Sequence, residues 1–390
     1  MWALVENEVL KFLRGKKFLI FLLSLILVFV YGGFSVYHEA NEKRPENLMD
    51  SNNKTIAVLN ESIRYDNFQG DKNELLKNIE NLERQNEVYQ KEISNMFKDK
   101  EEYIKGKIAI LENQKKYAEA EKNTILEEEA TGKLQYYNYF SSSDLTPKRD
   151  YEVSAFEDIS KVISKVSIIL IPILIVFAAS DLVSGEYDAS TIKMLLAKPV
   201  SRGKIICSKF ISSILIIITT LTLIELITFL VLGFSTNFRS YNSPMLIGTK
   251  YAMVNEEVGA VLGSTYLIEA WKVIGITFIV QIAFIICSVA FALLLSTIFK
   301  TTVTSLGIGT ITVAIISLLI FFMPFPFMKE IYPLIFISYS STLEILTGAL
   351  NRNLGGSNIS ISLGLIVLAI WAVSCFTASY KIFTKEDVLT

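Results

Sequence analysis

Long apolar runs separated by polar segments are the dominant pattern along this chain. Six of these runs contain about 20 residues or more and few charges, and about 20 residues of helix are needed to cross the hydrocarbon core of a membrane. The sequence therefore predicts an all-α integral membrane protein with six transmembrane helices. We expect them at residues 18–37, 162–180, 205–234, 273–299, 302–323 and 358–380.

Basic residues indicate on which side of the membrane each connecting segment lies. Short loops rich in lysine and arginine stay in the cytoplasm, whereas long loops do not follow this rule. The basic residues that decide the orientation follow the second, fourth and sixth runs: Lys193, Lys198, Arg202, Lys204, Lys300, Lys381 and Lys385. We therefore expect both termini in the cytoplasm, with an amphipathic N-terminal helix at residues 1–17 and a tail at residues 381–390.

The longest polar segment, residues 38–161, is then extracellular. Between about residues 71 and 131 it has no proline, many Glu and Lys residues, and apolar residues at helical spacing whose phase slips near Asp99. We interpret this stretch as two helices folded back into an antiparallel hairpin, with one continuous helix as the alternative. A solvated stalk and a substrate- or partner-binding domain fit it equally well. Before the hairpin, residues 55–59 form a short β-like run.

Residues 235–272 and 324–357 are expected on the same outer side. Pro324, Pro326 and Pro333 interrupt helical hydrogen bonding in a sequence that stays apolar to about Leu350. Apolar backbone that cannot remain helical tends to re-enter the membrane or lie along its surface. We therefore expect a short re-entrant or interfacial helical pair in the second segment.

Composition argues against several classes of function. His38 is the only histidine, so a His-rich metal site cannot be built and nothing indicates a histidine-based triad. The three cysteines lie far apart inside apolar runs, and the formal net charge of -2 gives no reason to expect nucleic acid binding. No phosphate-binding G-x-x-x-x-G-K-S/T motif occurs. We expect no catalytic site, cofactor or metal in this chain.

Glu225 lies well inside the third apolar run, where a carboxylate is costly and usually faces the interior of the bundle. It is a candidate for a substrate path, and the alternative is a carboxyl group satisfied by Thr222 or Thr228. Gln281 and Thr310 are further polar candidates for such a path. Close helix packing or a dimer face explains these two residues as well.

A charged segment at residues 181–204 lies between two apolar runs at the expected cytoplasmic surface. Ile192, Leu195 and Leu196 can face the bundle while Glu186 faces water, and Pro199 ends such a helix. An amphipathic helix in this place can dock into a groove on a cytoplasmic partner. An ordinary positive-inside loop is the alternative.

Together these residues resemble the permease subunits of ABC-2-type ABC transporters. The resemblance covers residues 1–36 and 162–390, and Ser190 stands where these permeases usually carry glycine. It rests on an amphipathic N-terminal stretch, the six runs and the pattern Glu186-x4-Thr191-x3-Leu195-x3-Pro199-x2-Arg202-x6-Lys209. The residues that the resemblance assigns to coupling with an ATPase are Glu186, Thr191, Leu195, Pro199, Arg202, Lys204, Lys209, Glu8 and Lys11.

The resemblance implies a subunit of an exporter in the bacterial cell membrane. Separate ATPase subunits would bind ATP and magnesium, and a second permease copy or a paralogue would complete the transporter. Large outer domains occur in some permeases that handle antimicrobial peptides or cell-surface lipids. An amphiphilic substrate (a lipid, lipopeptide or antimicrobial peptide), with a possible role in resistance, is therefore the favoured expectation.

Two other classes of function stay open from the sequence. The first is a membrane-anchored scaffold or receptor that uses the outer hairpin and needs no ATPase. The second is an ion-coupled secondary transporter, which should show internal repeats and several buried charges. Only Glu225 lies deep in a run, and no convincing repeat is visible.

Overall fold

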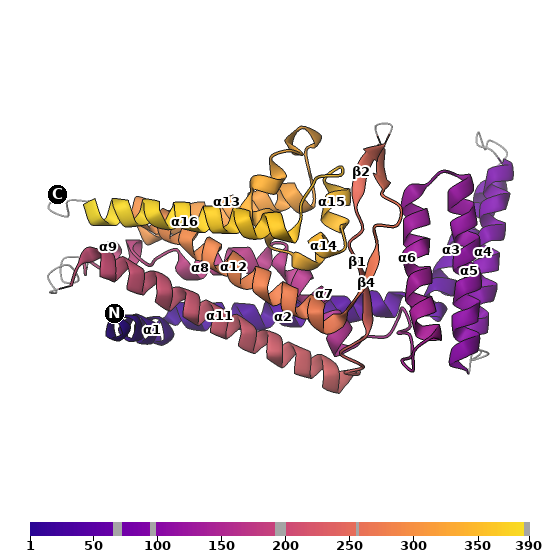
Figure 1. Ribbon diagram of the computed structural model, residues 1–390, viewed down its shortest axis with the longest axis horizontal. Helices are drawn as coiled ribbons and strands as arrows, with labels where there is room; N and C mark the ends of the chain where they lie inside the picture. The colour runs from indigo at the N-terminus through magenta and orange to yellow at the C-terminus, as the bar shows by residue number, and fades with distance from the viewer. Residues whose placement is uncertain (65–71, 94–98, 192–199, 255–256, 386–390) are drawn as a thin grey trace.

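A computed structural model describes residues 1–64, 72–93, 99–191, 200–254 and 257–385. The molecule is elongated, with a bundle of long helices at one end and a group of four helices at the other (Figure 1). The N-terminal helix and the end of the last helix lie together at the far end of the bundle (Figure 1). The four-helix group is therefore separated from the N-terminal helix and from the end of the last helix by the length of the bundle.

Five helices in the described part of the chain are long and apolar enough to cross a membrane. They are α2 (Lys16–Glu42), α11 (Arg202–Ser235), α12 (Ala270–Ile298), α13 (Thr302–Phe321) and α16 (Ile361–Lys385). A sixth span exists if α7 (Ala155–Ser167) and α8 (Leu170–Ala179) count as one, although they meet at a bend of 61°. The second expected span is therefore broken, whereas the other five overlap single helices.

Proline explains where the second span breaks. Pro172 is the third residue of α8 and has no N–H to donate to the carbonyl of Ile168, so a continuous helix would lose a hydrogen bond there. The residue before α8, Ile169, has left helical geometry, with φ -131° and ψ -48°. The bend thus follows from a proline inside an otherwise uninterrupted apolar run.

Helix α12 forms the centre of the bundle. In its most apolar stretch 56% of the residues are buried inside the protein, against 22–33% for the other four candidate spans. Small residues such as Ala290, Ala292 and Ser288 are fully buried on α12, which lets neighbouring helices approach closely. The outer helices instead expose apolar side chains such as Leu27 and Phe34, as a lipid-facing surface requires.

The N-terminal helix α1 (Trp2–Arg14) packs against α11 and α2 at the end of the bundle (Figure 1). Gly15 separates α1 from α2 by adopting an extended conformation, with φ -74° and ψ 140°. On α1 the side chain of Val5 is buried, whereas the apolar side chains of Trp2, Leu10 and Leu13 are exposed. Residues 2–14 of the segment predicted as an N-terminal helix are thus helical, and its amphipathic role stays a prediction.

The four-helix group corrects the hairpin predicted for residues 71–131. It consists of α3 (Pro45–Arg64), α4 (Lys72–Ile93), α5 (Lys100–Ala120) and α6 (Thr124–Ser141). The predicted phase slip near Asp99 lies at the N-cap of α5, and a break between Ala120 and Thr124 separates α5 from α6, so residues 71–131 are not one continuous helix. The predicted partners were wrong, because α4 packs mainly against α3 and α5 mainly against α6.

The side chains between these helices explain the pairing. The side-chain amide of Asn52 on α3 donates a hydrogen bond to the side-chain oxygen of Asn86 on α4 at 3.0 Å. Between α5 and α6 a separate apolar core forms from Tyr103, Ile104, Leu111, Tyr137 and Phe140. The β-like run predicted at residues 55–59 was also wrong, since it lies inside α3, where the helix can pair with α4.

A strand ribbon lies between α6 and the bundle, so the fold is not purely helical (Figure 1). β1 (Pro244–Ile247) pairs with β4 (Tyr266–Glu269), and β2 (Tyr251–Val254) pairs with β3 (Glu257–Ala260), both antiparallel. Pro244 lies opposite Glu269, and Tyr251 opposite Ala260. The sequence reasoning missed these strands because each has four residues, too few for an alternating pattern to be distinctive.

The segment before the last span is built from short helices. Three are 3-10 helices, η1 (Pro326–Met328), η2 (Tyr332–Leu334) and η3 (Phe336–Tyr339), and two are α-helices, α14 (Thr342–Leu346) and α15 (Ala349–Asn353). Tyr332, Ile337 and Tyr339 are buried against the bundle. The helical pair predicted here corresponds to α14 and α15, and its depth in a membrane stays a prediction.

A buried ion-pair cluster joins the linker after α6 to the start of α7. The Asp158 carboxylate lies 2.5 Å from the ammonium of Lys148 and 2.8 Å from that of Lys161, and it accepts a hydrogen bond from the Ser154 amide at 2.8 Å. The side chain of Asp158 is 2% exposed and that of Lys148 10%. A buried charge needs such partners to be tolerated. This cluster is thus the joint between the four-helix group and the bundle.

Replacing Asp158 with asparagine should weaken this joint. The ammonium of Lys148 would lose its closest carboxylate in a buried site, so we expect the free energy of unfolding to fall by about 3 kcal/mol. Thermal unfolding of the detergent-solubilised protein, followed by circular dichroism, measures the change.

Asp50→Asn is the matched control. Asp50 pairs with Lys54 at 2.6 Å on the exposed surface of α3, and such pairs contribute less than about 1 kcal/mol. If the two variants were equally stable, Asp158 would not hold the joint.

Candidate functional site

A buried carboxylate, Glu186, is the meeting point of three elements at the end of the bundle where α1 and the last turns of α16 lie. It belongs to α9 (Ser184–Asp188), a short helix between α8 and α11, and is only 4% exposed. One of its oxygens accepts hydrogen bonds from Lys209, at 2.8 Å, and from Lys11. The other accepts the hydroxyl of Thr191 at 2.5 Å.

Lys209 extends this contact to the N-terminal helix. Its ammonium lies on α11, is 3% exposed, and donates to Glu186 and, at 3.1 Å, to Glu8 of α1. Lys11, one turn after Glu8, reaches Glu186 from the exposed side of the same cluster. Helices α1, α9 and α11 are therefore connected by one chain of ion pairs: Glu8, Lys209, Glu186 and Lys11.

The environment keeps Glu186 ionised. Burial by itself would raise the pKa of this carboxyl, but the charge of Lys209 and the hydrogen bonds from Lys11, Lys209 and Thr191 outweigh burial and lower the pKa to about 2. At neutral pH Glu186 therefore acts as a fixed anion. It is suited to holding helices together and not to carrying protons.

Backbone geometry explains how Thr191 reaches Glu186. Ser190 has φ +54°, a left-handed conformation that costs an L-residue energy and that glycine adopts readily. The chain reverses there, and the amide of Thr191 donates to the carbonyl of Glu186 at 3.0 Å. The glycine usual at this position in the resembling permeases would serve the same turn, which serine makes here.

Buried serines position α9, and the sequence reasoning missed them. At the turn between α8 and α9, the amides of Val183 and Ser184 both donate to the hydroxyl of Ser296 on α12, at 2.9 and 3.0 Å. The hydroxyl of Ser305 on α13 donates to the carbonyl of Ser180 at 2.7 Å. A serine in an apolar run usually bonds to its own helix, so its sequence position does not reveal such a role.

Charged groups beside α9 fix it further. Asp188 accepts the amide of Thr302, near the start of α13, at 2.7 Å. Asp181 pairs with Lys17 of α2 at 2.6 Å. The sequence offers one signal for both contacts. Asp181, Asp188 and Lys17 are charged residues that border apolar runs, where a helix end meets water.

The other predicted coupling residues lie in different places. Arg202 and Lys204 begin α11, about two turns before Lys209, and Lys204 is exposed. Leu195 and Pro199, with the amphipathic helix expected around them, lie outside the described residues. The structure thus brings together Glu8, Lys11, Glu186, Thr191 and Lys209 from the predicted set.

The predicted substrate-path residues do not form one group. Glu225, buried on α11, accepts a hydrogen bond from the amide of Gln281 on α12, so the expected partners Thr222 and Thr228 are replaced by a neighbouring helix. Thr310 instead donates to the carbonyl of Leu306 on its own helix at 2.7 Å. The Glu225–Gln281 contact is thus explained as a helix–helix hydrogen bond, and its role in a substrate path stays a prediction.

Among the residues with described positions, no group of three or more His, Cys, Asp or Glu side chains is placed to hold a metal ion. A family model described as ABC-2 family transporter protein matches residues 2–388. The matched range includes the four helices α3–α6 as well as the bundle. No curated protein matches the chain.

Acid should weaken the protein through Glu186. A carboxyl whose pKa is lowered from 4.5 to about 2 in the folded state stabilises that state above pH 4.5, and this contribution is lost as the pH falls toward 2. Between pH 7 and pH 3 we expect a loss of about 2 kcal/mol from this group. Glu186→Gln cannot titrate, so it should be less stable at pH 7 and lose less on acidification.

Chemical unfolding of wild type and Glu186→Gln in detergent at both pH values measures this difference. Glu46→Gln is a suitable control, since it removes an exposed carboxylate from the first turn of α3. Parallel pH dependences for wild type and Glu186→Gln would contradict the assigned role.

Proposed function

Because the chain belongs to the ABC-2 family of transporter proteins, we propose that it is the transmembrane permease subunit of an ATP-driven exporter. The observation that carries this proposal is the buried ion-pair chain that connects α1, α9 and α11 through Glu186. Glu186 lies within the polar segment at residues 181–204, for which docking to a cytoplasmic partner is expected.

The ion pairs give that segment a mechanical connection to the bundle. Glu186 joins α9 to Lys209 on α11, while Ser296 joins the turn before α9 to α12, at the centre of the bundle. A displacement of α9 would therefore be passed to a peripheral helix, to the central helix and to α1. This arrangement suits a coupling element, because rigid elements transmit a push that a mobile loop would absorb.

Energy would come from another protein. The sequence has no phosphate-binding motif, so ATP and magnesium would be bound by separate ATPase subunits that dock against residues 181–204 and α1. A second permease copy or a paralogue would complete the membrane part. We place both termini and this docking surface in the cytoplasm of a bacterial cell, and the four-helix group outside, on the basis of the positive-inside rule.

An amphiphilic substrate fits the proposal best. The four-helix group stands at the end of the bundle opposite the docking surface (Figure 1). It consists of two helical pairs, and α6 packs against the strand ribbon. A lipid, lipopeptide or antimicrobial peptide leaving the membrane would meet these helices, and its removal could confer resistance.

The partner ATPase is the first prediction to test. Purification of the tagged chain from its native membrane in mild detergent should retain a P-loop ATPase in stoichiometric amount, identified by mass spectrometry and an ATPase assay. The charge reversal Arg202→Glu should remove the ATPase while the purified chain stays folded, since Arg202 begins α11 beside the expected docking segment.

Lys54→Glu provides the matched charge reversal in the four-helix group, where an exposed ion pair is broken far from the docking surface. This variant should keep the ATPase. If no ATPase co-purifies under conditions that preserve other membrane complexes, the protein is instead an anchored scaffold.

The substrate role of the outer helices has its own test. Deleting residues 46–93 removes α3 and α4 together and leaves the α5–α6 core with its five buried side chains intact. We expect basal ATPase activity of the reconstituted complex to persist, while stimulation by cationic amphipathic peptides or lysophospholipids is lost. Unchanged stimulation would reduce the α3–α4 pair to a spacer.

A further inference from the structure

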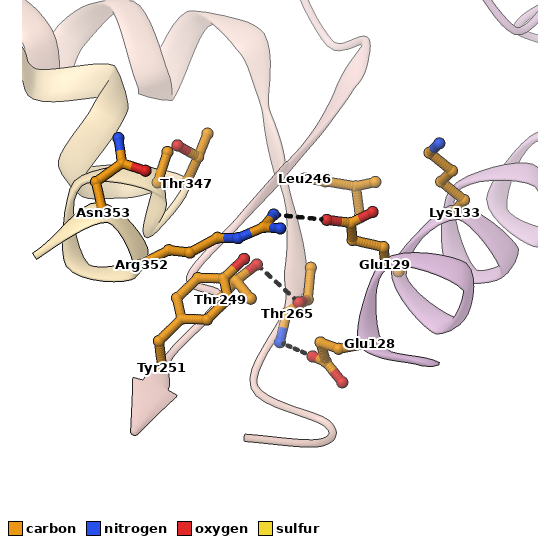
Figure 2. A pocket seen from close by; sticks show the side chains of 12 residues that line it. Glu128, Glu129, Lys133, Leu246, Thr249, Tyr251, Thr265, Thr347, Arg352 and Asn353 are labelled. Atoms are coloured by element: carbon orange, nitrogen blue, oxygen red, sulfur yellow. Dashed lines mark hydrogen bonds and ion pairs between the residues drawn. The ribbon is translucent and has the colours of Figure 1, made fainter. Parts of the chain in front are cut away.

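A cavity of about 490 Å³ lies where the four-helix group meets the bundle. Helix α6, the strand ribbon and the segment from the end of α14 through α15 each contribute a wall (Figure 2). Its volume is within the range of roughly 300–1,000 Å³ that is typical of small-molecule sites. The cavity lies at the opposite end of the bundle from Glu186, so it is separate from the coupling cluster.

An ion pair crosses the cavity. Arg352 extends from α15 to Glu129 of α6, with 3.1 Å between guanidinium nitrogen and carboxylate oxygen (Figure 2). Both side chains remain nearly half exposed, at 46% and 45%. An exposed pair of this kind is weak, so a competing anion of suitable geometry can replace the carboxylate on Arg352.

The other carboxylate that lines the cavity already accepts hydrogen bonds from the backbone. Glu128 is 1% exposed and accepts the amides of Gly263 and Thr265, both at 2.7 Å. Lys133, one turn along α6 from Glu129, is exposed and forms no ion pair among the residues that the structure describes. The wall therefore carries two cations, Arg352 and Lys133, and two carboxylates, of which only Glu129 is paired with a cation that a ligand can take over.

The third wall is held rigidly in place. Gly348 turns the chain into α15 with φ +78°, and a side chain at this position would come within 2.0 Å of the carbonyl oxygen of Thr249. The amide of Gly248 on the ribbon donates to the carbonyl of Leu346. Arg352 is thus presented from a fixed backbone, which reduces the entropy lost when it binds a ligand.

We propose that this cavity binds a phosphate group, on Arg352 and with Lys133 as a second cation. The planar guanidinium offers paired N–H donors that match phosphate oxygens, and Lys133 adds a charge without a fixed geometry. The phosphate belongs either to the headgroup of an anionic lipid or to a soluble phosphate compound. Because it competes with Glu129 for Arg352, its binding also loosens the contact between α6 and α15.

Binding of inorganic phosphate to the full-length protein tests the proposal, measured by ³¹P NMR line broadening in a nonionic detergent at constant ionic strength. Arg352→Gln should weaken binding at least about tenfold, and Lys133→Gln by about two- to fivefold. Glu129→Gln should strengthen binding by about two- to fivefold, since it frees Arg352 and removes a repelling charge. Lys54→Gln, with the same loss of charge on α3, should bind as wild type does.

The opposite signs separate a binding site from a structural effect. Arg352→Gln and Glu129→Gln break the same ion pair, so a general loss of structure would weaken phosphate binding in both. Equal binding by wild type and Arg352→Gln, or weaker binding by Glu129→Gln, would overturn the proposal.

Reconstitution distinguishes the two sources of phosphate. In vesicles of phosphatidylcholine with phosphatidylglycerol, loss of the broadening that is seen with phosphatidylcholine alone assigns the cavity to an anionic lipid headgroup. Broadening that persists in both vesicles assigns it to a soluble phosphate compound. The site itself is upheld in either case only if the four variants behave as stated.

Discussion

The contact between Glu186 and Lys209 is the interaction on which the coupling end of the bundle depends. Both side chains are almost fully buried, and neither charge would be tolerated there without the other. This ion pair fixes the position of α9 against α11, and a second ion pair, from Glu8 to the same lysine, fixes α1. A short helix of five residues could not hold a defined position by apolar packing alone. Ion pairing supplies the specificity that its size cannot.

Much of the bundle could be predicted from the sequence because lipid imposes one simple rule, that a span must be a long apolar helix. Five of the six expected runs overlap single helices for this reason. The break at Pro172 has a visible cause, yet the run around it stays apolar, so hydropathy alone joins α7 to α8. The aqueous helices were harder to assign. Their apolar residues predicted helix correctly, but the choice between α3 and α5 as the partner of α4 depends on contacts that periodicity does not contain.

The residues of the candidate site were likewise only partly predictable from the sequence. Glu186, Thr191 and Lys209 could be selected from the sequence because their spacing after the second apolar run resembles that of ABC-2 permeases. Their connection to Glu8 could not be derived, since 201 residues separate Glu8 from Lys209. The hydrogen bonds of Ser296 and Ser305 to the backbone around α9 could not be predicted for a different reason. Placing a serine in a membrane helix costs little free energy, because its hydroxyl can bond to its own helix. A serine in the sequence therefore does not indicate that it binds the backbone of another segment.

The bend between α7 and α8 also has a consequence for how the chain enters the membrane. As helices the two pieces are about 20 Å and 15 Å long, so neither alone crosses a hydrocarbon core of about 30 Å. The backbone amides of Val183 and Ser184, at the turn between α8 and α9, find their acceptor in Ser296, which follows more than 100 residues later. During synthesis this acceptor does not yet exist when α7 and α8 emerge from the ribosome. The turn that follows the second span can therefore make these hydrogen bonds only after α12 has been synthesised, although the turn is early in the sequence.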